Sequence, residues 1–213
     1  MGEPFRGPEV TAAWVAPVRL ADGTPAVLKV GLPHFEVRDE IAGLRFWNGD
    51  GAVRLLDADG ELNAMLLERC DPGTHLRRLP EPDQDVVLAG LLRRLWRRPP
   101  RQPFRPLAEL TAHWTAQTLA DEHRWPDPAL NREGPLAIDP KAFVGDPAYD
   151  ATQHLFNCEG RLWSRPRETI RRMSALLDLD AERVHAWVFA RAAAEPRAEW
   201  REDELALART MRG

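Results

Sequence analysis

The stretch Ile138-Asp-Pro-Lys-Ala-Phe-Val-Gly-Asp-Pro-Ala-Tyr-Asp150 constrains the fold more than any other part of the chain. It begins inside a short apolar run, residues 136–138, which has strand character and is ended by a proline. Asp139 therefore stands at the end of a predicted strand. The Gly-Asp-Pro sequence at 145–147 predicts a turn, because Asp and Pro both favour turn conformations.

The N-terminal third predicts an antiparallel sheet with one helix. Four runs with strand character lie in pairs around Ala-Asp-Gly turns: residues 14–20, 25–30, 52–57 and 62–68. Between the pairs, apolar residues at helical spacing predict a helix over 35–47, and Asn48-Gly49 ends it. The predicted order is therefore β-β-α-β-β.

From residue 70 onward, helical periodicity dominates. Helices are predicted over 83–96, 107–123, 167–177, 181–194 and 199–211. Pro99-Pro100 stops the first of these, and Asp180 is expected to cap the helix that starts at 181. The sequence thus predicts an α+β protein with two lobes, a β-rich lobe over 1–69 and a mainly helical lobe over 70–213.

Four features follow one another in the order that phosphoryl transfer requires. Lys29 lies near the end of an apolar strand, and Glu40 lies on the next helix, with Glu36 as a rival partner for the lysine. An apolar strand then runs into a polar connector at 65–69, and Asp139 comes late. Each alone has an ordinary structural explanation. Together they supply a cation for nucleotide phosphates, an acid to position it, a hinge for a planar base and a carboxylate for magnesium.

Composition narrows the classes of partner. The formal net charge is −4 and the pI is near 5.9, which argues against nucleic acid and anionic membranes as partners. The arginines at 93–105 are therefore interpreted as a solvated helix end. Two cysteines, no apolar span and no signal core predict a cytoplasmic protein. The six histidines lack the spacing of a zinc site.

These segments resemble the aminoglycoside/hydroxyurea phosphotransferase family of the streptomycin 6-kinase type. The 138–150 motif, continuing to Asn157, is the most specific match, and residues 21–30, 40–47, 66–69, 91–96 and 103–108 support it. The similarity extends from about Thr11 to Glu195. It implies a protein-kinase-like two-lobed fold, ATP and Mg²⁺ as cofactors, and an aminoglycoside or hydroxyurea-like small molecule as the substrate.

The resemblance also implies residue roles. Lys29 would contact the α and β phosphates of ATP, and Glu40 would pair with Lys29. The adenine-facing hinge would be formed by Glu68, Arg69 and Cys70, and Asp139 would be the magnesium ligand. Asp146 and Asp150 would brace the loop instead of touching substrate. The oligomeric state is not specified by the sequence.

The chain departs from the family pattern ahead of the Ile-Asp-Pro strand. A loop of the type (His/Thr)-x-Asp-Leu-His-x-x-Asn, which supplies the catalytic aspartate and a magnesium-binding asparagine, is missing, and several dozen residues around it are absent. The glycine-rich strand pair ahead of Thr11 is missing too. Local substitutes would be Asp121 or Asp127 with Asn131. Slow or absent turnover is expected, because losing a general base costs about 10²–10⁴ in rate. The alternative is a catalytically inactive pseudokinase or a nucleotide- or drug-binding remnant.

Overall fold

The computed structural model describes residues 13–32, 35, 39–99, 101, 104–120, 143–194 and 202–211. The chain forms two compact units. The sheet unit consists of Met1–Pro80 and Arg94–Phe104, and the helical unit consists of Glu81–Arg93 and Arg105–Gly213. The assignment of functional lobes to 1–69 and 70–213 stays a prediction.

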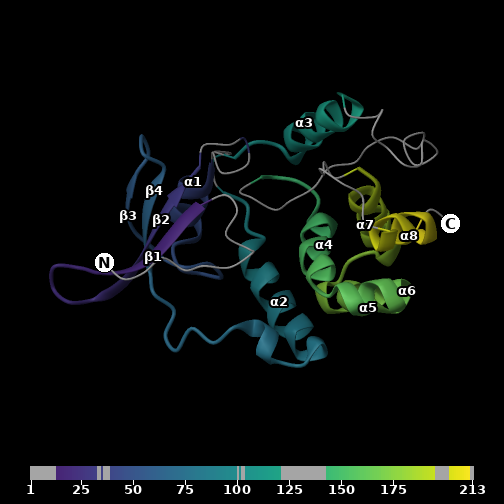
Figure 1. Ribbon diagram of the computed structural model, residues 1–213, viewed down its shortest axis with the longest axis horizontal. Coiled ribbons are helices and arrows are strands. Elements are labelled where there is room, and N and C mark those ends of the chain that lie inside the picture. The colour runs from purple at the N-terminus through teal and green to yellow at the C-terminus, as the bar shows by residue number, and fades with distance from the viewer. Residues whose placement is uncertain are drawn as a thin grey trace. The chain divides into compact units, whose positions relative to one another are not determined.

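The sheet unit is built on four antiparallel strands in the order β1-β2-β4-β3 (Figure 1). They are β1 (Ala13–Arg19), β2 (Pro25–Gly31), β3 (Leu55–Asp59) and β4 (Ala64–Glu68). The first hairpin closes as predicted at an Asp-Gly turn. Gly23 has φ +87°, a conformation that favours glycine, and the Thr24 N–H donates to Asp22 Oδ1 at 2.9 Å.

One helix, α1 (Glu40–Trp47), accompanies this sheet. Its buried Leu44 packs with Met65 and Leu67 of β4, and Val27 of β2 lies against the same cluster. The helix ends at Asn48, which adopts the left-handed conformation and donates its N–H to the Leu44 carbonyl. The predicted α+β class, with a small antiparallel sheet and one helix, is confirmed.

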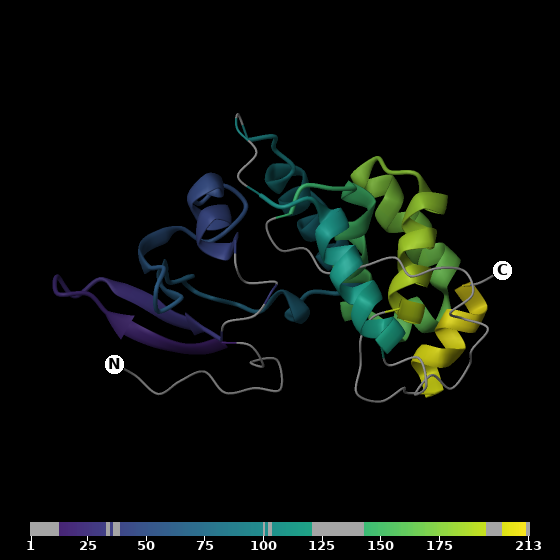
Figure 2. The ribbon, with the colours of Figure 1, turned by 90° about the horizontal axis from the view of Figure 1, so that it is seen from above.

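The helical unit contains most of α2 (Glu81–Leu95) and the six helices that follow. These are α3 (Leu107–Ala120), α4 (Pro147–Asn157), α5 (Glu159–Ser164), α6 (Pro166–Leu177), α7 (Ala181–Ala194) and α8 (Glu202–Met211). Helix α7 contacts α4, α6 and α8, and Figure 2 shows the yellow α8 beside it. Val184 and Val188 of α7 are fully buried. Within the described residues, no helix combines the length and the apolarity needed to cross a bilayer.

Helices α4 and α5 differ from the sequence prediction, which has only a turn at 145–147. The Gly-Asp-Pro sequence instead starts a helix. Asp146 accepts the Ala148 N–H at 3.0 Å as the N-cap, and Pro147 occupies the first helical position. Proline is tolerated there because that N–H would have no partner in any case. The predicted strand over 136–139 lies outside the described residues.

Candidate functional site

Lys29 lies on the face of the sheet that packs against α1. In β2 it pairs with Val15 of β1 on one side and with Met65 of β4 on the other. Side chains two residues apart share a face of a strand, so Lys29 points to the same side as Val27, which lies against the Leu44 cluster. The lysine is therefore only partly exposed, at 24%. A partly buried ammonium needs a counter-charge.

Glu40 provides that counter-charge. It is the first residue of α1, and its Oε1 lies in hydrogen-bonding contact with Lys29 Nζ. An acid in the first turn of a helix is favoured by the helix dipole. The structure thus brings together the two residues that sequence analysis pairs. The rival Glu36 lies outside the described residues. The role of this pair in nucleotide binding stays a prediction.

The predicted hinge, residues 68–70, begins at the last residue of β4. Glu68 is the last residue of that strand, and its carboxylate accepts the Arg54 N–H at 2.7 Å while its own N–H donates to the Arg54 carbonyl at 2.9 Å. The Glu68 side chain is thus used to join the ends of β3 and β4. Arg69 and Cys70 are exposed beyond it. Contact of this connector with adenine stays a prediction.

The predicted magnesium ligand, Asp139, lies outside the described residues, as do Asp121, Asp127 and Asn131, the possible substitutes for the catalytic loop. The segment after them is described from Phe143 onward. The Val144 N–H donates to the Arg105 carbonyl at 3.0 Å, and the Leu107 N–H donates to the Val144 carbonyl at 2.8 Å. This short parallel bridge fixes the start of α4 beside the start of α3.

The carboxylate of Asp146 contacts two helices, α4 and α7. Besides capping α4, its Oδ2 accepts the Trp187 Nε1–H at 2.8 Å and contacts Arg183 Nε, both on α7. Burial raises the pKa of Asp146, but hydrogen bonds from Trp187, the Ala148 N–H and Arg183 outweigh it and hold that pKa below its ordinary value. Asp146 therefore acts inside the protein as a brace between α4 and α7.

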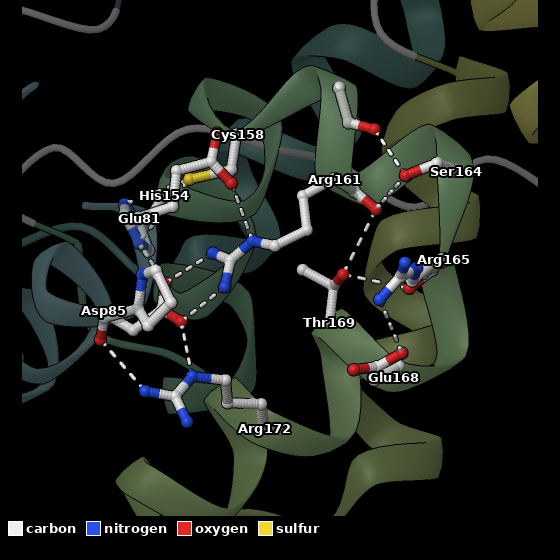
Figure 3. Close-up of polar contacts among 12 residues, drawn as sticks. Glu81, Asp85, His154, Cys158, Arg161, Ser164, Arg165, Glu168, Thr169 and Arg172 are labelled. Carbon is white, nitrogen blue, oxygen red and sulfur yellow. Dashed lines mark hydrogen bonds and ion pairs between the residues drawn. The ribbon is translucent and has the colours of Figure 1, made fainter.

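A buried charge cluster that sequence analysis missed lies at the N-terminal part of α2. Asp85 is 1% exposed, and three cationic side chains converge on it (Figure 3). Arg161 of α5 donates to both carboxylate oxygens at 2.6 and 2.7 Å, Arg172 of α6 donates at 2.8 Å, and His154 Nε2 of α4 lies at 2.8 Å. Cys158 Sγ lies 3.7 Å from His154 Nε2.

This cluster ties four helices together and does not suit a metal ion. Asp85, His154 and Cys158 do place their ligand atoms within 4.8 Å of one another. However, the Asp85 oxygens already accept from two guanidinium groups, and the same His154 nitrogen faces both Asp85 and Cys158. Two fixed positive charges beside the site would repel a cation. The His-x-x-x-Cys spacing at 154–158 is the signal in the sequence, because it places Cys158, the C-cap of α4, about one turn after His154.

Curated relatives match most of the chain. It is 33% identical over 222 residues to the streptomycin 6-kinase of Streptomyces griseus, and the alignment covers 84% of this chain and 72% of the relative. It is 33% identical over 233 residues to the hydroxyurea phosphotransferase of Kitasatospora aureofaciens, with 92% of this chain and 68% of the relative. The streptomycin 6-kinase of Streptomyces glaucescens is 32% identical over 223 residues.

Both alignments contain positions at which the relative has a residue and this chain has none. The alignment with the Streptomyces griseus protein has 222 positions, whereas 84% of the 213 residues here is about 179 residues. Roughly 43 aligned positions therefore have no residue of this chain opposite them. The same comparison with the hydroxyurea phosphotransferase leaves roughly 37 positions, because 92% of 213 is about 196 of the 233. The chain thus lacks several dozen residues that the relatives contain.

A family model gives independent support. The model described as aminoglycoside/hydroxyurea antibiotic resistance kinase matches residues 2–129, which is more than half of the chain and includes the Lys29–Glu40 pair. The α+β fold, with its antiparallel sheet, single accompanying helix and helical remainder, agrees with a kinase-like architecture. The chain belongs to the aminoglycoside/hydroxyurea antibiotic resistance kinase family.

Proposed function

We propose that this protein binds ATP with Mg²⁺ and acts as a small-molecule O-phosphotransferase of the antibiotic-resistance type. The observation that carries the proposal is the contact between Lys29 and Glu40, on a strand and a helix of one compact unit. A lysine oriented by a helix acid is the arrangement that phosphoryl transfer uses to hold nucleotide phosphates. The family membership supplies the reaction type.

The proposed roles follow from the placement of each group. Lys29 would bind the phosphates, and Glu40 would keep the ammonium in position. Backbone groups of the connector at 68–70 would face adenine, because the Glu68 side chain is used by Arg54. Asp139 would be the carboxylate that holds Mg²⁺, whose bound charge would offset the charge of the phosphates.

The substrate class comes from the relatives. Two of them are named as kinases of streptomycin and one as a phosphotransferase of hydroxyurea. We therefore propose an aminoglycoside or a hydroxyurea-like molecule as the phosphate acceptor, through a hydroxyl group.

A thermal-shift titration with ATP, with and without Mg²⁺, tests nucleotide binding. A ligand that binds only the folded state stabilises it by about 2.7 kcal/mol at roughly 100 times its dissociation constant. We expect a magnesium-dependent shift that Lys29→Ala and Asp139→Ala abolish. Glu40→Gln should weaken the shift, whereas its matched control Glu61→Gln, which changes an exposed acid in the same unit, should leave the shift unchanged. No shift in the unmodified protein would refute the proposal.

A second candidate function is nucleotide binding without phosphate transfer. The several dozen residues of the relatives that have no counterpart in this chain favour it, since the resemblance implies that the loop with the catalytic aspartate and asparagine is among them. Incubation with radiolabelled ATP and either streptomycin or hydroxyurea separates the two. A phosphorylated product supports the transferase, whereas an ATP-dependent thermal shift with no product from either acceptor supports the binding protein.

A further inference from the structure

Helix α1 is too short to hold its own position. It has eight residues, whereas isolated helices below about 12–15 residues are marginal in water. On the sheet side, its buried Leu44 meets Met65 and Leu67, and its partly buried Ile41 packs against the same cluster. The position of Glu40, at the first residue of α1, therefore depends on tertiary contacts at both ends of the helix.

The contacts at the C-terminal end of α1 come from the last two residues of α2 and the segment that follows them, which belong to the sheet unit. We call residues 94–104 the strap; its described residues are 94–99, 101 and 104. The Trp47 Nε1–H of α1 donates to the Leu95 carbonyl at 3.2 Å. The ring of Phe46 meets that of Phe104 edge to face, with centroids 5.5 Å apart. The strap thus holds the C-terminal turn of α1 through both of its aromatic residues.

Arg97 of the strap makes two contacts to this turn and one to Asp50 just beyond it. Its Nη2 donates to the Trp47 carbonyl at 3.1 Å, its guanidinium lies 5.4 Å from the centre of the Phe46 ring, and its Nη1 lies 3.1 Å from Asp50 Oδ2. Trp47 belongs to the last helical turn, whose carbonyls lack partners within the helix. A cation there satisfies one carbonyl and is favoured by the helix dipole.

Asp50 completes the attachment from the sheet side. It follows the α1 C-cap by two residues and contacts Arg94 Nε at 2.8 Å as well as Arg97. The hydrogen bond from Arg94, with the charges of Arg97 and Arg94, holds the pKa of Asp50 below its ordinary value despite desolvation. Gly51 packs against the strap too, since an added Cβ would lie 3.0 Å from Leu95 Cδ2.

We infer that the strap sets the position of α1, and through it the contact between Glu40 and Lys29, with Arg97 as the positioning residue. An α-helix transmits displacement along its axis because its hydrogen bonds make it stiff, and Glu40 and Trp47 are separated by about 10 Å of helix. Loosening the strap at Trp47 therefore moves Glu40 away from Lys29. The importance of this for nucleotide rests on the proposed function, but the mechanical coupling does not.

The lysine content of the chain provides a direct readout. It has two lysines, Lys29 and Lys141. Acylation of the purified protein by an N-hydroxysuccinimide ester, followed by peptide mass spectrometry, gives the labelling of Lys29 relative to Lys141. Glu40→Gln defines the ratio for a released Lys29. We expect Arg97→Ala, and Asp50→Asn from the other side, to raise the ratio at least about twofold, toward the Glu40→Gln value. Arg97→Lys, which keeps the positive charge, should raise the ratio less than Arg97→Ala does.

Arg98→Ala is the matched control, because Arg98 is an exposed arginine of the same strap. It should give the wild-type ratio, and circular dichroism should show that every variant is folded. A wild-type ratio in both Arg97→Ala and Asp50→Asn would overturn the inference. So would an unchanged ratio in Glu40→Gln, because the strap would then have no shielding contact to control.

Nucleotide affinity separates this inference from the proposed function. If the protein binds Mg·ATP, Arg97→Ala should weaken binding roughly threefold to tenfold, and should cause no further loss in a Glu40→Gln background, in which the contact with Lys29 is already released. If Arg97→Ala raises the labelling of Lys29 but the protein binds no ATP, the proposed function is refuted and the inference about the strap is supported. If Arg97→Ala binds ATP normally and leaves the labelling of Lys29 unchanged, the inference about the strap is refuted and the proposed function is unaffected.

Discussion

His154 Nε2 lies 2.8 Å from Asp85 Oδ1, and the two side chains are 5% and 2% exposed. Burial alone would lower the pKa of the imidazole. The hydrogen bond to Asp85, together with Cys158, outweighs burial and raises the pKa of His154 to about 9. Burial would raise the pKa of Asp85, but Arg161, His154 and Arg172 hold it well below its ordinary value. The helical unit therefore contains a buried, charged pair.

The first prediction concerns stability at alkaline pH. Because the pKa of His154 is about 9 when folded and 6.5 when unfolded, its contribution is fully present below pH 6.5 and is lost as pH rises through 9. Urea denaturation should show the free energy of unfolding falling by up to about 3 kcal/mol between pH 6.5 and 9.5. His154→Gln should remove this slope, whereas His185→Gln on α7 should keep it. Equal slopes in all three proteins would contradict the prediction.

A second prediction concerns the acid of the cluster. Asp85→Asn leaves the guanidinium groups of Arg161 and Arg172 around a neutral amide. Removing one partner of a buried ion pair costs about 3–5 kcal/mol, because the remaining charge is left uncompensated. Glu81→Gln is the matched control: Glu81 contacts Arg161 Nε at 2.8 Å but is 41% exposed, so its loss should cost less than about 1 kcal/mol. Similar urea midpoints for both variants would show that the cluster is not a stabilising pair.

Local signals in the sequence predict local structure here. The Asp-Gly turn at 22–23 and the Asp180 cap are both confirmed, the latter by a 2.9 Å bond from the Glu182 N–H. Both depend on residues two positions apart. Helix α4 was missed because Gly-Asp-Pro is equally compatible with a turn and with an N-cap followed by a first-turn proline. The helical continuation decides between them, through packing of residues such as Tyr149 and Leu155 that are fully buried.

The candidate site was predictable only in part, because local signals relate only residues that are close in the sequence. Lys29 and Glu40 are eleven residues apart, on a strand and the next helix, so strand parity and helix order suffice to pair them. The Asp85 cluster joins residues 69 to 87 positions apart. No periodicity relates such residues, and their meeting depends on how α2, α4, α5 and α6 pack. The strap contacts, 48 and 50 positions apart, share this property.

A third prediction concerns a glycine with no room for a side chain. A Cβ on Gly145 would lie 2.4 Å from Leu107 Cβ and 2.7 Å from Leu107 Cδ2. Gly145→Ala should therefore force apart the bridge between 106 and 144 and destabilise the protein by about 1–3 kcal/mol. Gly160→Ala in α5 is the control, because a Cβ there meets nothing within 4 Å. It should leave the melting temperature unchanged or raise it slightly, since alanine is the better helix former. Equal melting temperatures for the two variants would count against the predicted clash.

The last prediction separates the two functions of Asp146. Asp146→Ala removes both the α4 cap and the acceptor for Trp187 Nε1, whereas Asp146→Asn keeps one side-chain oxygen, enough for one of these two donors, and loses the charge beside Arg183. Losing an N-cap costs about 1 kcal/mol, and leaving a buried donor without a partner costs about 1–3 kcal/mol more. Asp180→Ala provides the cap loss alone, because Asp180 is exposed and caps α7 through the Glu182 N–H. Urea denaturation should thus show a larger loss for Asp146→Ala than for Asp180→Ala, and Asp146→Asn, which keeps one of the two bonds, should lose no more than Asp146→Ala. If Asp146→Ala costs no more than Asp180→Ala, the bond to Trp187 contributes nothing to stability, and Asp146 is a helix cap instead of a brace between α4 and α7.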